Sequence, residues 1–255
     1  MNVYGLAHTD IDVEILRSNM MGIEVHSHPS NLKIPYNFNE YHKTISDRIN
    51  GMTGVSMHGV INDMAYTSGD ALIVEVTKKR FAESVQAASF HGINSLIFHS
   101  SYRIYHAINK PLVDWYIKTS IEFWKDFERH IPDEMTVLLE NFEDEDPELI
   151  AQILQGIDSP KIRCCFDIGH AFAYSPVPLE QWIHVLGKYI KHIHINDNDG
   201  KRDLHLPLGK GSIPLLNVIN NILECVDMDI PFTLECSIPS SVDWLKANNL
   251  IHEFL

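Results

Sequence analysis

The sequence is poor in cysteine and has no long apolar run. Its four cysteines, two of them adjacent at Cys164 and Cys165, form neither a disulfide framework nor a C-x-x-C pair, so buried free thiols are expected. No apolar stretch approaches the length of a membrane span. The first residues, M-N-V-Y-G-L-A-H-T-D, lack the basic start and apolar segment of a secretory signal. Together these absences predict a cytoplasmic protein without a membrane partner.

Basic residues are also scarce. The chain has 20 Lys and Arg against 34 Asp and Glu, which gives a formal net charge of −14. Non-specific nucleic-acid binding depends on clustered Lys and Arg that neutralise phosphates, so this balance argues against nucleic acid as a partner. The sequence contains no G-x-G-x-x-G motif and no P-loop. Their absence removes the main motif support for an open nucleotide-binding sheet.

The sequence does contain a repeated alternation of short apolar runs and longer segments with helical periodicity. With 255 residues, 45% of them hydrophobic, the chain can bury the core of a single domain spanning residues 1–255. Polar residues end most of the apolar runs, as at the carboxyl ends of buried strands. The eight predicted strands are Val3–Ala7, Gly22–His26, Gly54–His58, Ser95–His99, Thr136–Glu140, Arg163–Asp167, Ile190–Ile195 and Phe232–Glu235.

Helical segments lie between these strands. Asp70 and the pair Asp146-Pro147 are typical helix starts, because an Asp at the N-cap accepts a backbone hydrogen bond and a Pro is tolerated at the first helical position. A first helix within Ile11–Met20 is short and has weaker signals. The other predicted helices are Ala71–Phe90, Pro111–His130, Pro147–Leu154, Leu179–Tyr189 and Leu215–Val226. Eight strand–helix units in a chain of this length predict a closed (β/α)8 TIM barrel.

The segment Lys191–Ile213 has the most concentrated site chemistry in the sequence. His192 and His194 alternate with isoleucines in a predicted strand, so both histidines point to the same side. The turn-forming sequence N-D-N-D-G follows. Asp203 and His205 are separated by one residue, which in an extended segment places a carboxylate and an imidazole on one face. With His194 they could bind a divalent cation.

Metal-ligating residue types also end most of the other predicted strands. In a parallel barrel all strand carboxyl ends meet at one face, so these side chains are expected to converge there. A cluster of buried carboxylates would repel itself unless cations neutralise it. The sequence therefore predicts a bound divalent transition metal, zinc or manganese foremost, with iron and cobalt also compatible. The nine predicted ligands are His58, His99, Glu140, Asp167, His170, His194, Asp203, His205 and Glu235.

The chain resembles the xylose isomerase-like TIM barrels, a superfamily that includes sugar phosphate isomerases and epimerases as well as endonuclease IV. The resemblance covers nearly the whole chain and is carried by E-N at Glu140, F-D-I-G-H at Phe166–His170, H-I-N-D at His194–Asp197, D-L-H-L-P-L-G-K-G-S-I at Asp203–Ile213 and L-E-C at Leu234–Cys236.

The two branches of this superfamily imply different sites. Isomerases and epimerases would hold one metal with Glu140, Asp167, His194 and Glu235, and both glutamates would serve as acid and base. Endonuclease IV would hold a trinuclear zinc cluster with all nine positions.

The loops do not match those of a DNA-binding member. Endonuclease IV-like proteins carry basic and bulky residues on loops after the early strands, whereas His8–Asp12 and Gly59–Asp70 contain no Lys or Arg here. The loop Phe142–Asp146 is strongly acidic and would repel phosphates. A modest basic set suffices for one small phosphate or a sugar, and within it we expect Arg103, Lys201 and Arg202 to bind substrate.

The leading hypothesis is therefore a metal-dependent isomerase or epimerase of a small sugar or sugar phosphate, in which Glu140 and Glu235 exchange the proton. Lyase or dehydratase chemistry could begin with the same proton abstraction. The alternatives are an endonuclease IV-like zinc phosphodiesterase acting at abasic sites and a non-catalytic barrel that binds metal or sugar. The sequence leaves the oligomeric state open, with a homodimer as one alternative.

Other residues carry weaker signals. His26 and His28 end the second predicted strand and could line the pocket, while Tyr102 and Tyr105 could touch substrate. The aromatic residues Trp115, Phe123, Trp124 and Phe127 have helical spacing, which is typical of packing.

Overall fold

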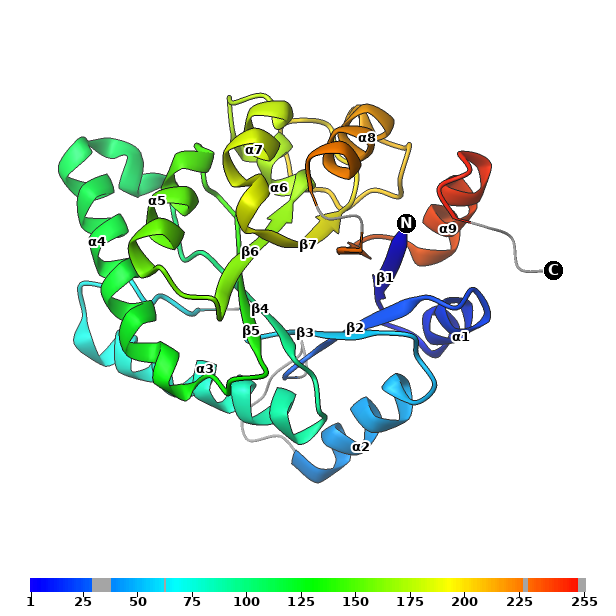
Figure 1. The fold of residues 1–255 in the computed structure, drawn as a ribbon, viewed down its shortest axis with the longest axis horizontal. Helices are drawn as coiled ribbons and strands as arrows, with labels where there is room; N and C mark the ends of the chain where they lie inside the picture. Colours follow the sequence, from blue (N-terminus) through cyan, green and yellow to red (C-terminus); the bar gives the residue numbers. More distant parts are fainter. Residues whose placement is uncertain (29–37, 62, 227–228, 252–255) are drawn as a thin grey trace.

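The computed structural model describes residues 1–28, 38–61, 63–226 and 229–251. Eight parallel strands close into a barrel in the order β1 to β8, and helices surround the strands (Figure 1). The strands are β1 (Asn2–Leu6), β2 (Gly22–His26), β3 (Val55–His58), β4 (Ser95–His99), β5 (Thr136–Glu140), β6 (Ile162–Asp167), β7 (Ile190–Ile195) and β8 (Pro231–Leu234). The predicted (β/α)8 barrel is confirmed.

Helices follow the strands around the barrel. They are α1 (Asp10–Ser18), α2 (Phe38–Ile49), α3 (Ala71–Phe90), α4 (Lys110–Phe127), α5 (Pro147–Ile157), α6 (Ile168–Tyr174), α7 (Leu179–Leu186), α8 (Leu215–Cys225) and α9 (Ile238–Ala247). Short 3-10 turns occupy Ile104–Ile108, Glu128–His130 and Gly187–Tyr189. No helix in the described ranges is both long and apolar enough to cross a membrane.

The predicted helix starts are confirmed, and several boundaries differ. The Asp70 side chain accepts the Leu72 amide, and Asp146 accepts the Glu148 amide, at 2.9 Å each. Helix α5 continues past the predicted end at Leu154 to Ile157. It ends there because the next residue, Asp158, adopts the left-handed region with a φ of 52°.

Helices α2, α6 and α9 were not predicted, and several strand ends differ from the prediction by one residue, as at β1, which ends at Leu6 and not at Ala7. Glu235 was predicted to end the last strand. Strand β8 ends at Leu234, one residue earlier. The Glu235 amide still donates to the Ile195 carbonyl at 3.1 Å, so Glu235 remains anchored beside β7.

Alternate residues of each strand point into the barrel, while their neighbours pack against the helices. Buried residues such as Ile193 and Leu139 belong to the large outer core, whereas Ile97, Leu138 and Cys165 form a separate apolar cluster. Polar side chains form the layer above this cluster. The register pairs His26 with His58, His99 with Glu140 and Asp167 with His194 across adjacent strands. These pairings place the predicted ligands at one level near the strand carboxyl ends.

Candidate metal centre

The nine predicted ligands fall into three groups, and within each group the potential ligand atoms lie within 4.8 Å of one another. The four-ligand group comprises Glu140, Asp167, His194 and Glu235; the His58 group comprises His58, His99 and Glu140; the His170 group comprises His170, Asp203 and His205. All nine predicted side chains are thus brought together, and their role as metal ligands stays a prediction.

Glu140 lies at the junction of the groups. Its Oε1 is 3.1 Å from His194 Nδ1 and 3.4 Å from His170 Nδ1. Its Oε2 is 3.1 Å from His58 Nε2 and 3.5 Å from His99 Nε2. Oε1 therefore faces His194 of the four-ligand group and Oε2 faces the imidazoles of the His58 group, so Glu140 is shared by the two groups.

The other carboxylates connect the remaining imidazoles. Glu235 Oε1 lies 3.1 Å from His194 Nδ1, the same nitrogen that faces Glu140. Asp203 Oδ2 lies 3.3 Å from His170 Nε2 and 3.0 Å from His205 Nε2. Because the groups are contiguous, a charge in one group changes the electrostatic potential at the ligands of the next.

The loop after β7 delivers Asp203 and His205 to this cluster. An antiparallel bridge between Asp197 and Leu206 closes the loop at its base. Gly200 adopts a φ of 73°, as its place in the N-D-N-D-G turn predicts. His205 itself has a φ of 46°, an uncommon conformation for a residue with a side chain. The loop thus tolerates local strain at a residue of the site, as functional residues often do.

Backbone carbonyls fix the orientation of three imidazoles. The carbonyls that accept from Nδ1 are Gly59 for His58 at 3.0 Å, Asn141 for His170 at 2.9 Å and Glu235 for His205 at 2.6 Å. With Nδ1 carrying the proton, the Nε2 lone pair of each ring is directed into the cluster. Such bonds to the far nitrogen are what metal-ligating histidines usually make.

The electrostatics of the cluster favour a bound cation. Burial, with the like charges of Glu235 and Glu140, raises the pKa of Asp167 to about 7. Burial lowers the pKa of His99 to about 3, which keeps that imidazole neutral and able to ligate. Asp167 Oδ2 and Asp203 Oδ1 are buried and accept no hydrogen bond from any described residue. These oxygens without hydrogen bonds, together with imidazoles and no thiolate, fit a borderline divalent ion such as zinc, manganese, iron or cobalt.

A cavity of about 490 Å³ opens above the cluster. Glu235 and the imidazoles of His58, His99, His170 and His205 line it, whereas Glu140 is completely buried beneath them. The cavity wall also contains His26, one of the weaker predictions, and His8 and Asp12, which were not among the predicted site residues. His8 lies between β1 and α1, and Asp12 lies in the first turn of α1.

The residues predicted to bind substrate lie outside the cavity lining. Arg103 pairs with Glu143 at 3.1 Å and lies over the Phe142 ring. Arg202 pairs with Asp199 at 2.8 Å, and Lys201 is exposed. Their role in binding substrate stays a prediction, and in this conformation each would have to move to reach the cavity.

Glu24 is a buried carboxylate beside the cluster that was not among the predicted site residues. It is fully buried in β2, and its oxygens lie 3.2 and 3.3 Å from His194 Nε2. The signal was present in the sequence, since a single charged residue interrupts the apolar strand G-I-E-V-H. A charge in such a strand is costly unless it is paired.

A comparison to family models agrees with the fold. The model of the xylose isomerase-like TIM barrel family matches residues 15–249. The chain belongs to this family. The resemblance inferred from the strand-end motifs is thereby confirmed.

Relatives of known sequence match over shorter segments. An uncharacterised protein of Methanocaldococcus jannaschii is 32% identical over 110 residues, which are 43% of this chain and 36% of that protein. A probable endonuclease 4 of Mesomycoplasma hyopneumoniae is 30% identical over 99 residues, 34% of this chain and 36% of that protein. The matched region thus spans only about a third of the length of these relatives.

Solved structures match over nearly the full chain at low identity, and so bear on the fold alone. A Thermus thermophilus protein soaked with zinc chloride has a TM-score of 0.72 at 22% identity, covering 97% of both chains. A D-tagatose 3-epimerase-like protein has a TM-score of 0.73 at 21% identity, covering 98% of this chain and 97% of the other. The IolI protein with a bound zinc atom has a TM-score of 0.76 at 14% identity and covers 100% of both chains.

Proposed function

We propose that this protein is a metal-dependent isomerase or epimerase of a small sugar or sugar phosphate. The observation that supports this function is the four-ligand group, which lies beneath a cavity of about 490 Å³ and exposes Glu235 to it. Cavities of this volume are typical of small-molecule sites. The net charge of −14 and the acidic residues of Phe142–Asp146 suit a small ligand better than a polyanion.

The comparisons are compatible with this proposal. The structures that share the fold include proteins described as a D-tagatose 3-epimerase-like protein, a D-psicose 3-epimerase and a probable 3-DHS dehydratase. A dehydratase among them keeps lyase chemistry open as a variant of the same proton abstraction.

Glu235 is the residue best placed to move the substrate proton. A bound divalent cation would supply Lewis-acid polarisation of a substrate carbonyl. The Glu235 carboxylate lines the cavity, so it can take a proton from the carbon next to that carbonyl. The backbone carbonyl of Glu235 also accepts a hydrogen bond from His205 Nδ1, so Glu235 is tied to another residue that lines the cavity.

Glu140 has no exposed surface and would act through imidazoles. Its Oε2 contacts His58 and His99, both of which line the cavity. Both nitrogens of His58 are engaged, Nδ1 by the Gly59 carbonyl and Nε2 by Glu140. We infer that the His99 ring, whose Nε2 faces Glu140, passes the proton between substrate and Glu140, whereas the sequence alone suggested direct transfer. The reaction then has two proton-handling groups, as inversion of one carbon requires when a proton leaves one face and another is returned to the opposite face.

Proton exchange with solvent tests this function without knowledge of the product. The zinc-, manganese- and cobalt-loaded protein is incubated in D₂O with a panel of ketoses, aldoses and their phosphates, and NMR follows deuterium at the carbon next to the carbonyl. We expect exchange with at least one sugar. We expect Glu235→Gln and Glu140→Gln to abolish it, because the amide keeps the volume but loses basicity.

A matched control separates loss of chemistry from loss of folding. Glu14→Gln makes the same change in a surface ion pair with Arg17, and it should exchange the substrate proton at the wild-type rate. If Glu235→Gln retains near wild-type exchange on the true substrate, the assignment of this base is wrong.

A zinc phosphodiesterase is the second candidate, and the position of Glu140 favours it. A carboxylate whose two oxygens face separate imidazole pairs suits a multinuclear centre, and such centres stabilise both the attacking and the leaving oxygen of a phosphoryl transfer. The matched segment of a probable endonuclease 4 is in accord with it.

Salt dependence distinguishes the two candidates. A DNA enzyme that neutralises six or more phosphates loses affinity on the order of a thousandfold between low and physiological salt. We expect a labelled abasic duplex, titrated at low salt with zinc present, to bind weakly and to remain uncut. Submicromolar, salt-sensitive binding with cleavage 5′ to the lesion would replace the sugar proposal by the phosphodiesterase.

A further inference from the structure

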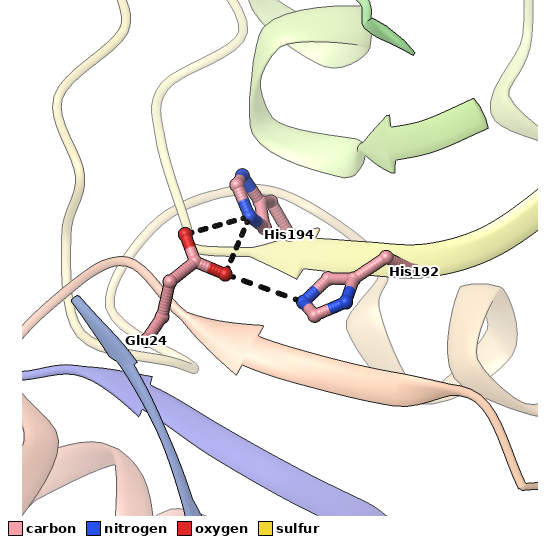
Figure 2. Close-up of side chains that lie close together, drawn as sticks. All are labelled: Glu24, His192 and His194. Carbon is pink, nitrogen blue, oxygen red and sulfur yellow. Dashed lines mark hydrogen bonds and ion pairs between the residues drawn. The ribbon is translucent and has the colours of Figure 1, made fainter. Parts of the chain in front are cut away.

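The fully buried carboxylate of Glu24 lies on the barrel axis side of β2, next to the four-ligand group. Figure 2 shows it facing His192 and His194 of β7, with dashed lines that join both its oxygens to His194 and one of them to His192. None of these three side chains has any exposed surface. Neither the proposed ligand set nor the proposed proton transfer uses Glu24.

His194 presents its two nitrogens to two different environments. Nδ1 lies 3.1 Å from Glu140 Oε1 and 3.1 Å from Glu235 Oε1, inside the four-ligand group. Nε2 lies 3.2 Å from Glu24 Oε1 on the opposite side of the ring. A proton on Nε2 would be donated to Glu24, and the Nδ1 lone pair would then be directed at the four-ligand group.

Other side chains hold Glu24 in this position. Its Oε2 accepts the Ser56 hydroxyl at 2.8 Å and the Thr233 hydroxyl at 3.1 Å. Thr233 in turn lies 2.7 Å from His192 Nε2, which therefore donates to the threonine oxygen. The carboxylate is thus fixed from three strands. Its Oε2 also makes the hydrogen bond with His194 Nε2 at 3.3 Å, whereas Oε1 lies 3.2 Å from the same nitrogen and accepts no hydrogen bond from any described residue.

We propose that Glu24 is a positioning residue of the metal centre, which accepts the Nε2 proton of His194 and thereby fixes the ring and its tautomer for metal binding through Nδ1. The inference rests on the metal centre of the proposed function and is independent of the reaction. Three other imidazoles of the cluster are oriented by backbone carbonyls, and His194 is oriented by a buried carboxylate instead. A carboxylate is the stronger acceptor and makes the ligating nitrogen more basic.

Cobalt binding tests this role without an activity assay. Co²⁺ is titrated into the metal-free protein, with visible absorption as the readout and a competing chelator to set the range. We expect Glu24→Gln to weaken the affinity by about 10–100-fold, the usual effect of removing the partner of a ligating histidine. We also expect Glu24→Asp, which keeps the charge but shortens the reach, to weaken it in the same direction.

A double-mutant cycle separates positioning from general loosening of the barrel. In a His194→Ala background the carboxylate has no ligand to orient, so Glu24→Gln should have no further effect on Co²⁺ affinity. Ser56→Ala is the matched control, because it removes a hydrogen bond to the same carboxylate and leaves the contact with His194 in place. The loss of Co²⁺ affinity in Ser56→Ala should be smaller than the loss in Glu24→Gln.

Several results would overturn the inference. Unchanged cobalt affinity in a folded Glu24→Gln protein would do so, as would an equal loss in the His194→Ala background. Loss of one whole ion from the bound stoichiometry, with the rest unchanged, would mean that Glu24 and His192 ligate metal themselves. A wild type that binds no cobalt would overturn the metal centre of the proposed function together with this inference.

A measurement on the wild type does not depend on the folding of any variant. Long-range ¹⁵N–¹H spectra of the zinc-loaded protein, assigned by comparison with His194→Ala, report which nitrogen of His194 carries the proton. We expect a protonated Nε2 and a metal-shifted Nδ1. The reverse tautomer would refute the role of Glu24.

Discussion

Removal of bound metal should lower the stability of this protein by a measurable amount. The four-ligand group places three carboxylates, Glu140, Asp167 and Glu235, around one imidazole nitrogen with little or no solvent. A cation that binds only this folded arrangement stabilises it by about 2.7 kcal/mol at a free concentration 100 times its Kd. For a chain of this length about 1 kcal/mol shifts the Tm by roughly 2–4 °C, so the expected shift is roughly 5–11 °C for one ion.

The assay compares thermal unfolding of the purified protein before and after treatment with a chelator, followed by return of zinc, manganese or cobalt. Magnesium is the control, because a site with several imidazoles favours borderline transition metals over hard cations. Asp167→Asn should show a smaller gain from the added ion, since it removes one of the buried carboxylates. A metal-free protein whose Tm rises with none of the three transition metals would refute the metal centre.

Two further predictions concern the loops around the site. Gly211→Ala should lower metal occupancy and stability, because the added Cβ would lie 2.3 Å from the Asn198 carbonyl oxygen in the loop that carries Asp203. Gly69→Ala is the control, since an added Cβ there has nothing within 4 Å. Equal metal occupancy in the two variants would contradict this prediction. Burial raises the pKa of Asp144 from 3.8 to about 6, so its ionisation destabilises the folded state as pH rises through this window. The unfolding free energy of Asp144→Asn, measured by urea denaturation, should therefore rise relative to that of the wild type by about 3 kcal/mol as the pH goes from acid to neutral. A difference between the two proteins that does not change with pH would contradict this prediction.

The strand ends of the site were predictable because strand periodicity and barrel topology together determine where these residues lie. His99 and Glu140 end separate apolar runs, and parallel pairing necessarily places the two at one level. Short elements were less predictable. Helix α6 begins directly after Asp167, so the sequence offers no loop to separate it from β6.

Contacts between distant segments could not be predicted from local patterns. The sequence suggested that Arg103 faces the cavity, yet it pairs with Glu143, which lies 40 residues away in the chain. Glu24 was missed for a related reason. Its partner, His194, lies 170 residues away, and only barrel closure brings β2 and β7 to the same interior.

The distribution of the ligands along the chain has a consequence for folding. The four-ligand group needs residues from β5, β6 and β7 and from the segment after β8, and the His58 group adds β3 and β4. No N-terminal fragment that ends before Glu235 holds the complete set, although most of the barrel could already have formed. High-affinity metal binding should therefore come late in folding, after the last strand pairs with its neighbours. The ion would then stabilise the closed barrel without taking part in its earlier assembly.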